Sequence, residues 1–510
     1  MSSPYDSEEK GSGISSPDET HVDVPLRDRE EAIAERFGPF QSFFVKLANM
    51  GVEARGIERV PEDERSDRNS LNSLFLWFSV NTVLTTVPIG SLAQAYFTLT
   101  LPHTIGVTMG FAALGCLLPA FIATLGPKTG LRTMVIARYS SGYVGGSIFS
   151  FLNILTQMGF SVTCVILGGL TLSSINDALP LTWGIIIVSI CTLIICFFGY
   201  GVLHIYERYV WTVLLVVMLM LYGLGGKAGY DVNAQKAFED TGRNYAGDVL
   251  SYGGIVFGSC AGWAPVAADY NVRLPANTSS VKVFFLVFFG IWIPVTLIEI
   301  LGAALMTTPG AADLYESGSI GAILASILEP WHGFGKFILV ILSLSVIANN
   351  VPNTYSAALS FQALTPWFQR IPRAVWTLVV AIAYTIAGVV GREHFSSVLS
   401  NLLSILSYWT AFFVVIVAEE HFLFRRGKMG YDLEAYEDSK KLPLGIAAIV
   451  SGLLGVMGAV LGMAETYYIG VIGIKVAQPY GGDLGFELAA AFTAVSFPIL
   501  RWFEIKWTGR

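Results

Sequence analysis

Charged residues are scarce in this sequence of 510 residues, and their scarcity excludes an ordinary soluble fold. They make up 14% of the chain, whereas soluble domains carry roughly 25%. Hydrophobic residues make up 53%, and the mean hydropathy is +0.59. Apolar runs of about 20 residues, the length that crosses a bilayer as a helix, recur from residue 71 onward. The composition therefore predicts an all-α, polytopic membrane protein.

Cysteine and histidine are too few and too scattered for the chemistry that they usually serve. All five cysteines fall inside apolar runs, without a CxxC pair or a neighbouring histidine cluster, which argues against a disulfide framework or a metal site. The six histidines are dispersed and lie mostly at the ends of apolar runs. An enzyme would need a nucleophile beside a base, or a metal cluster. We therefore expect no enzyme activity, no metal and no cofactor.

The net charge of −7 comes entirely from the first 70 residues, which hold 9 basic and 16 acidic side chains. This region is polar and has no apolar stretch typical of a cleaved signal peptide, so we expect a largely disordered cytoplasmic tail over residues 1–70. Phe40, Phe43, Phe44 and Leu47 recur at helical spacing and predict a short amphipathic helix near 38–50. Because the remaining charges balance, the net charge indicates nothing about the substrate.

Twelve apolar runs predict twelve transmembrane helices within residues 71–503, followed by a short cytoplasmic C-terminus at 504–510. Their approximate bounds are 72–96, 104–125, 144–171, 182–200, 205–224, 249–267, 283–306, 337–363, 374–391, 395–424, 443–463 and 485–503. With the N-terminus inside, thirteen basic residues fall in cytoplasmic loops and six in the opposite loops. This bias predicts that both termini are cytoplasmic.

Two of these spans contain helix-breaking residues near their centres, and they lie five spans apart. In many transporters each of two related halves opens with an interrupted helix that exposes backbone groups to a substrate near the bilayer midplane. The pattern predicts two five-span halves followed by two additional helices, although Gly and Pro are also common in ordinary membrane helices. The residues concerned are Thr85, Thr86, Pro88 and Gly90 in the first span and Gly262, Trp263 and Pro265 in the sixth.

The eighth span places three amides around a proline, Pro352, which we expect to interrupt the helix. Asn349 and Asn353 are four residues apart and share a helix face. A carboxamide carries donors and an acceptor in one plane, and this matches the edge of a pyrimidine or a purine. Asn350 lies on another face, where a hydrogen bond to a neighbouring helix is the simpler role. Interhelical bonding is also an alternative for the other two amides.

Aromatic side chains offer flat surfaces on which a base could stack. Trp263 is the first candidate, since stacking contributes about 1 to 3 kcal/mol per base in single-strand binding proteins. In the third span, Phe160 and Thr163 share a face and could add a second aromatic wall and a hydroxyl. Core packing explains Phe160 equally well. With Thr85, Thr86 and Gly262, these residues complete the predicted binding site.

The sequence resembles the nucleobase-cation symporter-1 family, and within it the fungal purine-cytosine permeases. The resemblance rests on GWAPVAADYNVRLP at 262–275, ANNVPNTYS at 348–356, and the third span with its glycines and amides. It implies a five-plus-five inverted repeat of the LeuT-like kind that works by alternating access. It also implies a heterocycle held between aromatics of the third and sixth spans, with amide contacts from the third and eighth.

The sequence departs from the family pattern at four positions. Phe160 stands where several relatives have Trp, and Cys164 stands where the bacterial hydantoin carrier has a recognition amide. In sodium-driven relatives, hydroxyl residues that help to coordinate the ion precede the first amide of the eighth span, whereas this chain has Ile347 and Ala348. Because hard cations need oxygen ligands, the resemblance implies a proton as the coupling ion.

Acidic residues within or beside the predicted spans are the candidates for carrying that proton, because ionisable groups at membrane depth are usually functional. The candidates are Glu299, which lies deepest, Glu207 and Asp269. The leading hypothesis is a plasma-membrane importer of cytosine and of purines such as adenine, guanine and hypoxanthine. Its partners would be a small-molecule base and the lipid bilayer, with no nucleic acid.

Two alternatives stay open at this stage. The chain could carry uracil, allantoin, a hydantoin, or a vitamin such as pyridoxine or thiamine. It could also be a nutrient receptor in the membrane that signals without transport, although such a receptor usually carries a folded cytosolic region and the tail looks too polar to fold alone.

Overall fold

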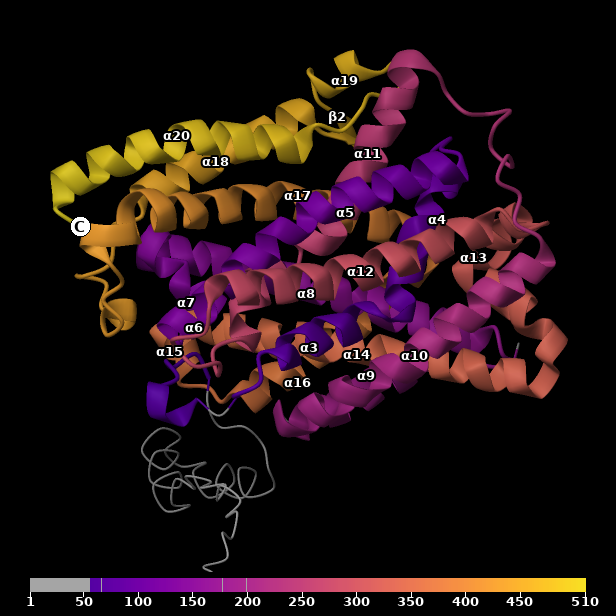
Figure 1. Cartoon of the computed structure of the whole chain (residues 1–510), viewed down its shortest axis with the longest axis horizontal. Helices are drawn as coiled ribbons and strands as arrows, with labels where there is room; N and C mark the ends of the chain where they lie inside the picture. Colours follow the sequence, from indigo (N-terminus) through magenta and orange to yellow (C-terminus); the bar gives the residue numbers. More distant parts are fainter. Residues whose placement is uncertain (1–55, 66, 177, 199) are drawn as a thin grey trace, which may run out of the picture. The chain divides into compact units, whose positions relative to one another are not determined.

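The computed structural model describes residues 56–510, except 66, 177 and 199. The predicted amphipathic helix near 38–50 and most of the predicted tail lie outside the described residues. The described part is built almost entirely from helices (Figure 1). One short antiparallel hairpin pairs β1 (Ala464–Glu465) with β2 (Tyr468–Ile469). The structure is therefore mostly helical, in agreement with the composition.

The helices follow one another with short connections. The longer ones are α3 (Leu71–Asn81), α4 (Val87–Ala95), α5 (Leu101–Ala123), α8 (Arg138–Ser173), α9 (Leu181–Phe198), α10 (Tyr200–Ala228), α11 (Gly242–Ala261), α12 (Ser280–Met306), α13 (Ala311–Leu328), α14 (His332–Leu364), α16 (Arg373–Gly391), α17 (Phe395–Glu419), α18 (Ile446–Gly462) and α20 (Gly485–Thr508). A π-helix of 10 residues, η7 (Glu420–Met429), follows α17. The shorter ones are η2 (Glu62–Glu64), η3 (Leu84–Thr86), α6 (Leu125–Thr129), α7 (Thr133–Ile136), η4 (Ala264–Tyr270), η5 (Glu329–Trp331), α15 (Pro366–Gln369), η6 (Arg392–His394), η8 (Ala435–Glu437) and α19 (Gly473–Val476).

Eight helical stretches in the described residues are long and apolar enough to cross a membrane. The number becomes nine when the bent pair at residues 71–95 counts as one span, and two shorter apolar helices add to these. Some stretches contain two helices in succession, such as α16 and α17 within Arg373–Arg425. The chain is thus a multi-pass helical membrane protein, while the twelve-span layout stays a prediction.

The first span is broken, but earlier than the sequence predicted. α3 and α4 meet at an angle of 62°, and the chain leaves the helical conformation at Thr82 and Val83, where Val83 is fully extended. Pro88 lies in the first turn of α4, where a proline costs little because its missing N–H would be unpaired in any case. Gly90 lies inside α4 and breaks nothing. The break therefore precedes these two residues.

The sixth span is interrupted where α11 gives way to the 3₁₀ helix η4, at Gly262 and Trp263. Pro265 occupies the first turn of η4. In contrast, the expected interruption at Pro352 is wrong, because α14 continues through this proline. Membrane helices tolerate an internal proline where the surrounding protein covers the affected turn, and Pro352 is buried within the bundle. Tyr270 in η4 donates a hydrogen bond to the Pro352 carbonyl oxygen at 3.2 Å and so ties η4 to α14.

Packing of the helices brings both breaks to the centre of the bundle. α14 lies along α8, while α12 packs against α3, α4 and α5 (Figure 1). α18 and α20 run side by side at one edge, in contact with α17. The broken elements thus lie inside a shell of continuous helices, where neighbouring groups can satisfy non-helical backbone at membrane depth.

The last part of the predicted tail packs against the bundle. Ile57 and Val60 are buried, and the Val60 backbone N–H donates to the carbonyl oxygen of Gly130 at 2.9 Å. The Arg65 guanidinium donates to the carbonyl oxygen of Pro127 at 2.5 Å. Residues 56–65 are therefore an ordered segment that packs beside α6. For residues 1–55 the disorder stays a prediction.

Candidate binding cavity

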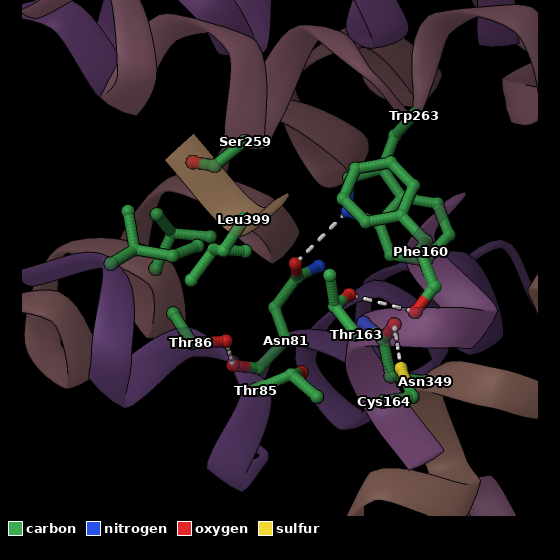
Figure 2. A pocket seen from close by; sticks show the side chains of 12 residues that line it. Asn81, Thr85, Thr86, Phe160, Thr163, Cys164, Ser259, Trp263, Asn349 and Leu399 are labelled. Carbon is green, nitrogen blue, oxygen red and sulfur yellow. Dashed lines mark hydrogen bonds between the residues drawn. The ribbon is translucent and has the colours of Figure 1, made fainter. Parts of the chain in front are cut away.

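A cavity lies between the two breaks, and its walls come from six of the predicted spans. Its empty volume is about 410 Å³ when space open to solvent is included. None of its twelve lining side chains carries a formal charge, so an uncharged ligand suits it best. Figure 2 draws them; they are Asn81, Thr85, Thr86, Ile89, Phe160, Thr163, Cys164, Ser259, Trp263, Val295, Asn349 and Leu399.

Two aromatic rings face each other across the cavity wall. The rings of Phe160 in α8 and Trp263 after α11 are nearly parallel, at 7°, and their centroids are 6.1 Å apart. A flat heterocycle between them needs about 7 Å, because carbon atoms pack best about 3.5 Å apart on each side. The distance between the ring planes cannot exceed the 6.1 Å between the centroids, so the pair must open by at least about 1 Å to admit a base.

Gly262 makes this close approach possible. A Cβ atom at this position would lie 2.9 Å from two ring carbons of Phe160, which is closer than carbon atoms normally pack. Gly262 does not itself line the cavity. Its role in the structure is to leave room for the Phe160 ring, so its predicted place in the binding site is indirect.

The amides of α14 form a network that reaches the cavity through only one of them. Asn349 lines the cavity and donates to the carbonyl oxygen of Val80 at 2.8 Å. Its own Oδ1 accepts from Asn353 at 3.0 Å and from the thiol of Cys164 at 3.4 Å. Asn353 is fully buried behind it and does not line the cavity. Asn350 donates to Thr192 of α9 at 3.3 Å, which is the interhelical contact expected of it.

The threonines that were predicted for the site do line the cavity, but two of their hydroxyl groups donate hydrogen bonds to backbone carbonyl oxygens. Thr86 donates to the carbonyl oxygen of Asn81 at 2.9 Å, and Thr163 donates to that of Phe160 at 2.8 Å. Their oxygen lone pairs stay available as acceptors. Thr85 lies beside them on η3.

The sequence analysis missed several lining residues, and two of them are polar. Asn81 is the last residue of α3, directly before the break, and Ser259 lies in α11 beside Gly258. Ser259 could have been found by looking for polar residues within about one turn of Gly262, and Asn81 by looking within about two turns of Pro88. The others, Ile89, Val295 and Leu399, carry no signal that distinguishes them from residues of the apolar core.

The three acidic candidates lie in different surroundings. Glu299 in α12 is fully buried; its Oε1 lies 2.9 Å from the Ser259 hydroxyl, and its Oε2 has no hydrogen-bond partner among the described residues. Asp269 accepts from the backbone N–H of Thr133 at 2.7 Å and so ties η4 to the start of α7. Glu207 belongs to α10, and its side chain lies outside the described part of the chain. Of the two candidates whose side chains are described, Glu299 is the one with a hydrogen bond to a residue of the cavity wall.

Comparison with known proteins finds a matching family and several relatives. Residues 59–480 match the model of a family described as permeases for cytosine/purines, uracil, thiamine and allantoin. The purine-cytosine permease fcyB of Emericella nidulans is 39% identical over 91% of each chain. The purine-cytosine permease FCY21 of Saccharomyces cerevisiae is 35% identical over 97% of this chain and 94% of its own.

A solved structure supports the fold. The nucleobase-cation-symport-1 transporter Mhp1, closed with bromovinylhydantoin bound, matches with a TM-score of 0.67 at 15% identity. The match covers 89% of this chain and 95% of Mhp1. At this identity the likeness concerns the arrangement of the helices alone.

Proposed function

The chain belongs to the family of permeases for cytosine/purines, uracil, thiamine and allantoin, and on that premise we propose that it imports cytosine and purine bases together with a proton. Adenine, guanine and hypoxanthine are the purines expected. The transporter would have twelve spans, with two inverted five-span repeats and two further helices, and would work by alternating access. It would lie in the plasma membrane with both termini in the cytoplasm, as the excess of basic residues in the assigned cytoplasmic loops suggests.

The observation that carries this proposal is the parallel pair of Phe160 and Trp263 beside the amide of Asn349. A flat, neutral heterocycle would stack between the rings, and stacking of this kind contributes about 1 to 3 kcal/mol per base. The remaining Asn349 N–H and the threonine lone pairs can meet the polar edge of the ring. Nucleobases are neutral at physiological pH, which fits a wall of uncharged side chains.

The proton is proposed to reside on Glu299 when the cavity is closed, and hydrogen-bond counting supports this. The Ser259 oxygen lies 2.8 Å from the carbonyl oxygen of Val256 and 2.9 Å from Glu299 Oε1. Both of these are acceptors if Glu299 is ionised, yet a serine hydroxyl has one proton to donate. A protonated Glu299 satisfies both contacts, because it donates to Ser259 while Ser259 donates to Val256.

The surroundings of Glu299 also favour its neutral form. Its side chain is 0% exposed, and within the described part of the chain one of its oxygens has no hydrogen-bond partner. An ionised carboxylate in such a place would lose its hydration without a compensating ion pair, which is strongly unfavourable. Release of the proton would then require water to reach Glu299, and Ser259 offers the route because it lines the cavity.

A proton is preferred to sodium because the eighth span offers little to a metal ion. Ile347 and Ala348 precede Asn349 and supply no side-chain oxygen. The carbonyl oxygen of Val80, on the facing side of the first break, already accepts the Asn349 amide. Hard cations bind oxygen ligands that are free to coordinate them.

The experiment is uptake of radiolabelled cytosine by cells that lack their own base carriers. It compares acidic and neutral medium, the presence and absence of sodium, and the addition of a protonophore. We expect saturable uptake that persists without sodium and is abolished by the protonophore. Trp263→Ala should abolish it, whereas Trp183→Ala, at a 58% exposed position of α9, is the matched control and should have no effect.

A second candidate function within the same family is transport of a different ring. Cys164 lines the cavity with a thiol, which it offers to Asn349, and it supplies no amide to the ligand. This favours a ligand with fewer polar groups facing α8. Absence of cytosine uptake by a protein that reaches the cell surface would overturn the cytosine assignment and favour uracil, allantoin, a hydantoin or a vitamin such as thiamine or pyridoxine.

A further inference from the structure

Asn81 joins the two interrupted spans inside the cavity wall. It is the last residue of α3 and is 3% exposed. Its Oδ1 accepts a hydrogen bond from the indole Nε1–H of Trp263 at 3.1 Å, and its Nδ2 donates to the carbonyl oxygen of Trp77 at 2.8 Å. Figure 2 shows the first of these bonds reaching from Asn81 to the Trp263 ring.

The orientation of this amide is fixed by its partners. An indole N–H can only donate and a backbone carbonyl can only accept, so the oxygen of Asn81 must face Trp263 and the nitrogen must face Trp77. The backbone oxygen of Asn81 also accepts from Thr86, at 2.9 Å. Asn81 is therefore held on both sides of the first break.

The bond acts on the plane of the Trp263 ring. The Nε1–H lies in the plane of the indole and is its single hydrogen-bond donor, so a fixed acceptor at this point limits rotation of the ring about its side-chain bonds. The edge of Trp77 adds a second contact, with centroids 5.5 Å apart and planes at 73°. Together these contacts hold Trp263 within 7° of the plane of Phe160.

Asn349 and Asn353, the other amides near the cavity, bond to groups other than the Trp263 indole. Asn349 is bonded to Val80, Asn353 and Cys164, and Asn353 is bonded to Asn349. Among the described residues, Asn81 is the hydrogen-bond acceptor of the Trp263 indole N–H. The stacking wall is thus anchored from the first span and not from the eighth.

We propose that Asn81 is a positioning residue that holds Trp263 parallel to Phe160, so that a flat base can enter between them. The proposal rests on the proposed function, because it assigns the aromatic pair to base binding. It also gives a physical link between the two broken helices: movement of α3 or of the first break shifts the stacking wall directly.

The test is a double-mutant cycle on base binding by the purified, full-length protein. Asn81→Leu removes the acceptor, and Trp263→Phe keeps an aromatic face but removes the N–H. Binding of cytosine, adenine, hypoxanthine, uracil, allantoin and hydantoin is measured for the wild type, both single variants and the double variant. Asn72→Leu, on the same helix α3 but bonded to Asp67 outside the cavity, is the matched control.

We expect Asn81→Leu to weaken binding of the preferred base about tenfold, the effect of losing a hydrogen bond of ordinary strength. In the Trp263→Phe background the same substitution should change affinity by less than about twofold, because the bond that it removes is already absent. Asn72→Leu should leave affinity unchanged. Thermal unfolding of each variant separates lost binding from lost folding.

Two different results would overturn two different statements. If Asn81→Leu weakens binding about tenfold in both backgrounds, Asn81 acts independently of the indole and the positioning role is wrong, while the proposed function stands. If the folded wild-type protein binds none of the six compounds, the proposed function fails, and the positioning role fails with it.

Discussion

Replacing Glu299 by glutamine separates base binding from proton coupling. The carboxyl group is buried against Ser259, whose oxygen lies 2.9 Å from Glu299 Oε1. Glutamine has the same shape, carries no charge, and can donate its amide hydrogen to Ser259 as a protonated glutamate would. Glu299→Gln therefore imitates the protonated state and cannot leave it.

The expected loss can be worked out for one proton per base. A difference of one pH unit across the membrane is worth about 1.4 kcal/mol, or about tenfold in accumulation. A potential of about 100 mV adds about 2.3 kcal/mol for one charge, or about fiftyfold. A variant that never releases its proton loses the whole of this driving force, so base should only equilibrate. Affinity should stay within about threefold of wild type, because the hydrogen bond to Ser259 is retained.

The assay uses purified protein in lipid vesicles. Accumulation of radiolabelled cytosine is driven by an imposed pH gradient, and exchange against unlabelled internal cytosine is measured without a gradient. Glu299→Gln should retain exchange and lose accumulation. Glu393→Gln, at a side chain that is 75% exposed, is the matched control and should keep both. Accumulation of base by Glu299→Gln under the gradient would refute the reasoning and move the proton to another group.

Three further predictions concern packing and charge. Gly262→Ala should raise the KM for base uptake by crowding the Phe160 ring, at a cost of about 1–3 kcal/mol; Phe160→Leu in the same chain should relieve the crowding in thermal unfolding but should not restore the KM, because it also removes an aromatic wall. Burial and the nearby Asp483 carboxylate raise the pKa of Glu465 from 4.5 to about 7, so the folded protein keeps this proton when the unfolded chain releases it. The free energy of unfolding should thus fall by up to about 3 kcal/mol between pH 4.5 and pH 7, and thermal unfolding of Glu465→Gln should lack this fall. Glu420→Ala should cost about 3–5 kcal/mol in thermal unfolding, because it leaves two buried arginines without the carboxylate that they contact at 2.8 Å.

The membrane-spanning helices could be predicted from composition because each is a long apolar run, and the run itself is the cause of the helix. The seventh predicted span, 283–306, differs from α12 (Ser280–Met306) by three residues at one end. The position of the break in the first span was harder to predict, because Pro88 and Gly90, on which the prediction rested, both lie inside α4. Pro88 is compatible with the first turn of a helix, so the chain departs from helical geometry before it, at Thr82 and Val83.

The candidate site could be predicted only in part, because the sequence does not show which turn of a helix lies at the level of the cavity. Helical spacing correctly puts Asn349 and Asn353 on one face of α14. Spacing says nothing about which turn of that face meets the cavity, and the cavity reaches Asn349 alone. Asn81 was missed because one amide in an apolar helix resembles an ordinary interhelical contact. Only the folded chain brings it within 3.1 Å of an indole from the sixth span.

Gly90 links the broken first span to the proposed proton site, although it does not break the helix. A Cβ atom at Gly90 would overlap the backbone carbonyl of Glu299, and one at Gly302 would overlap that of Val87. Glycine at these positions lets α4 lie directly on α12. The side chain of Glu299 meanwhile contacts Ser259 in α11. The acid therefore lies between α4 and α11, the two helices that adjoin the breaks, so a change in its charge alters the contact between them. This geometry gives a physical reason why loss of the proton would favour separation of these helices and opening of the cavity.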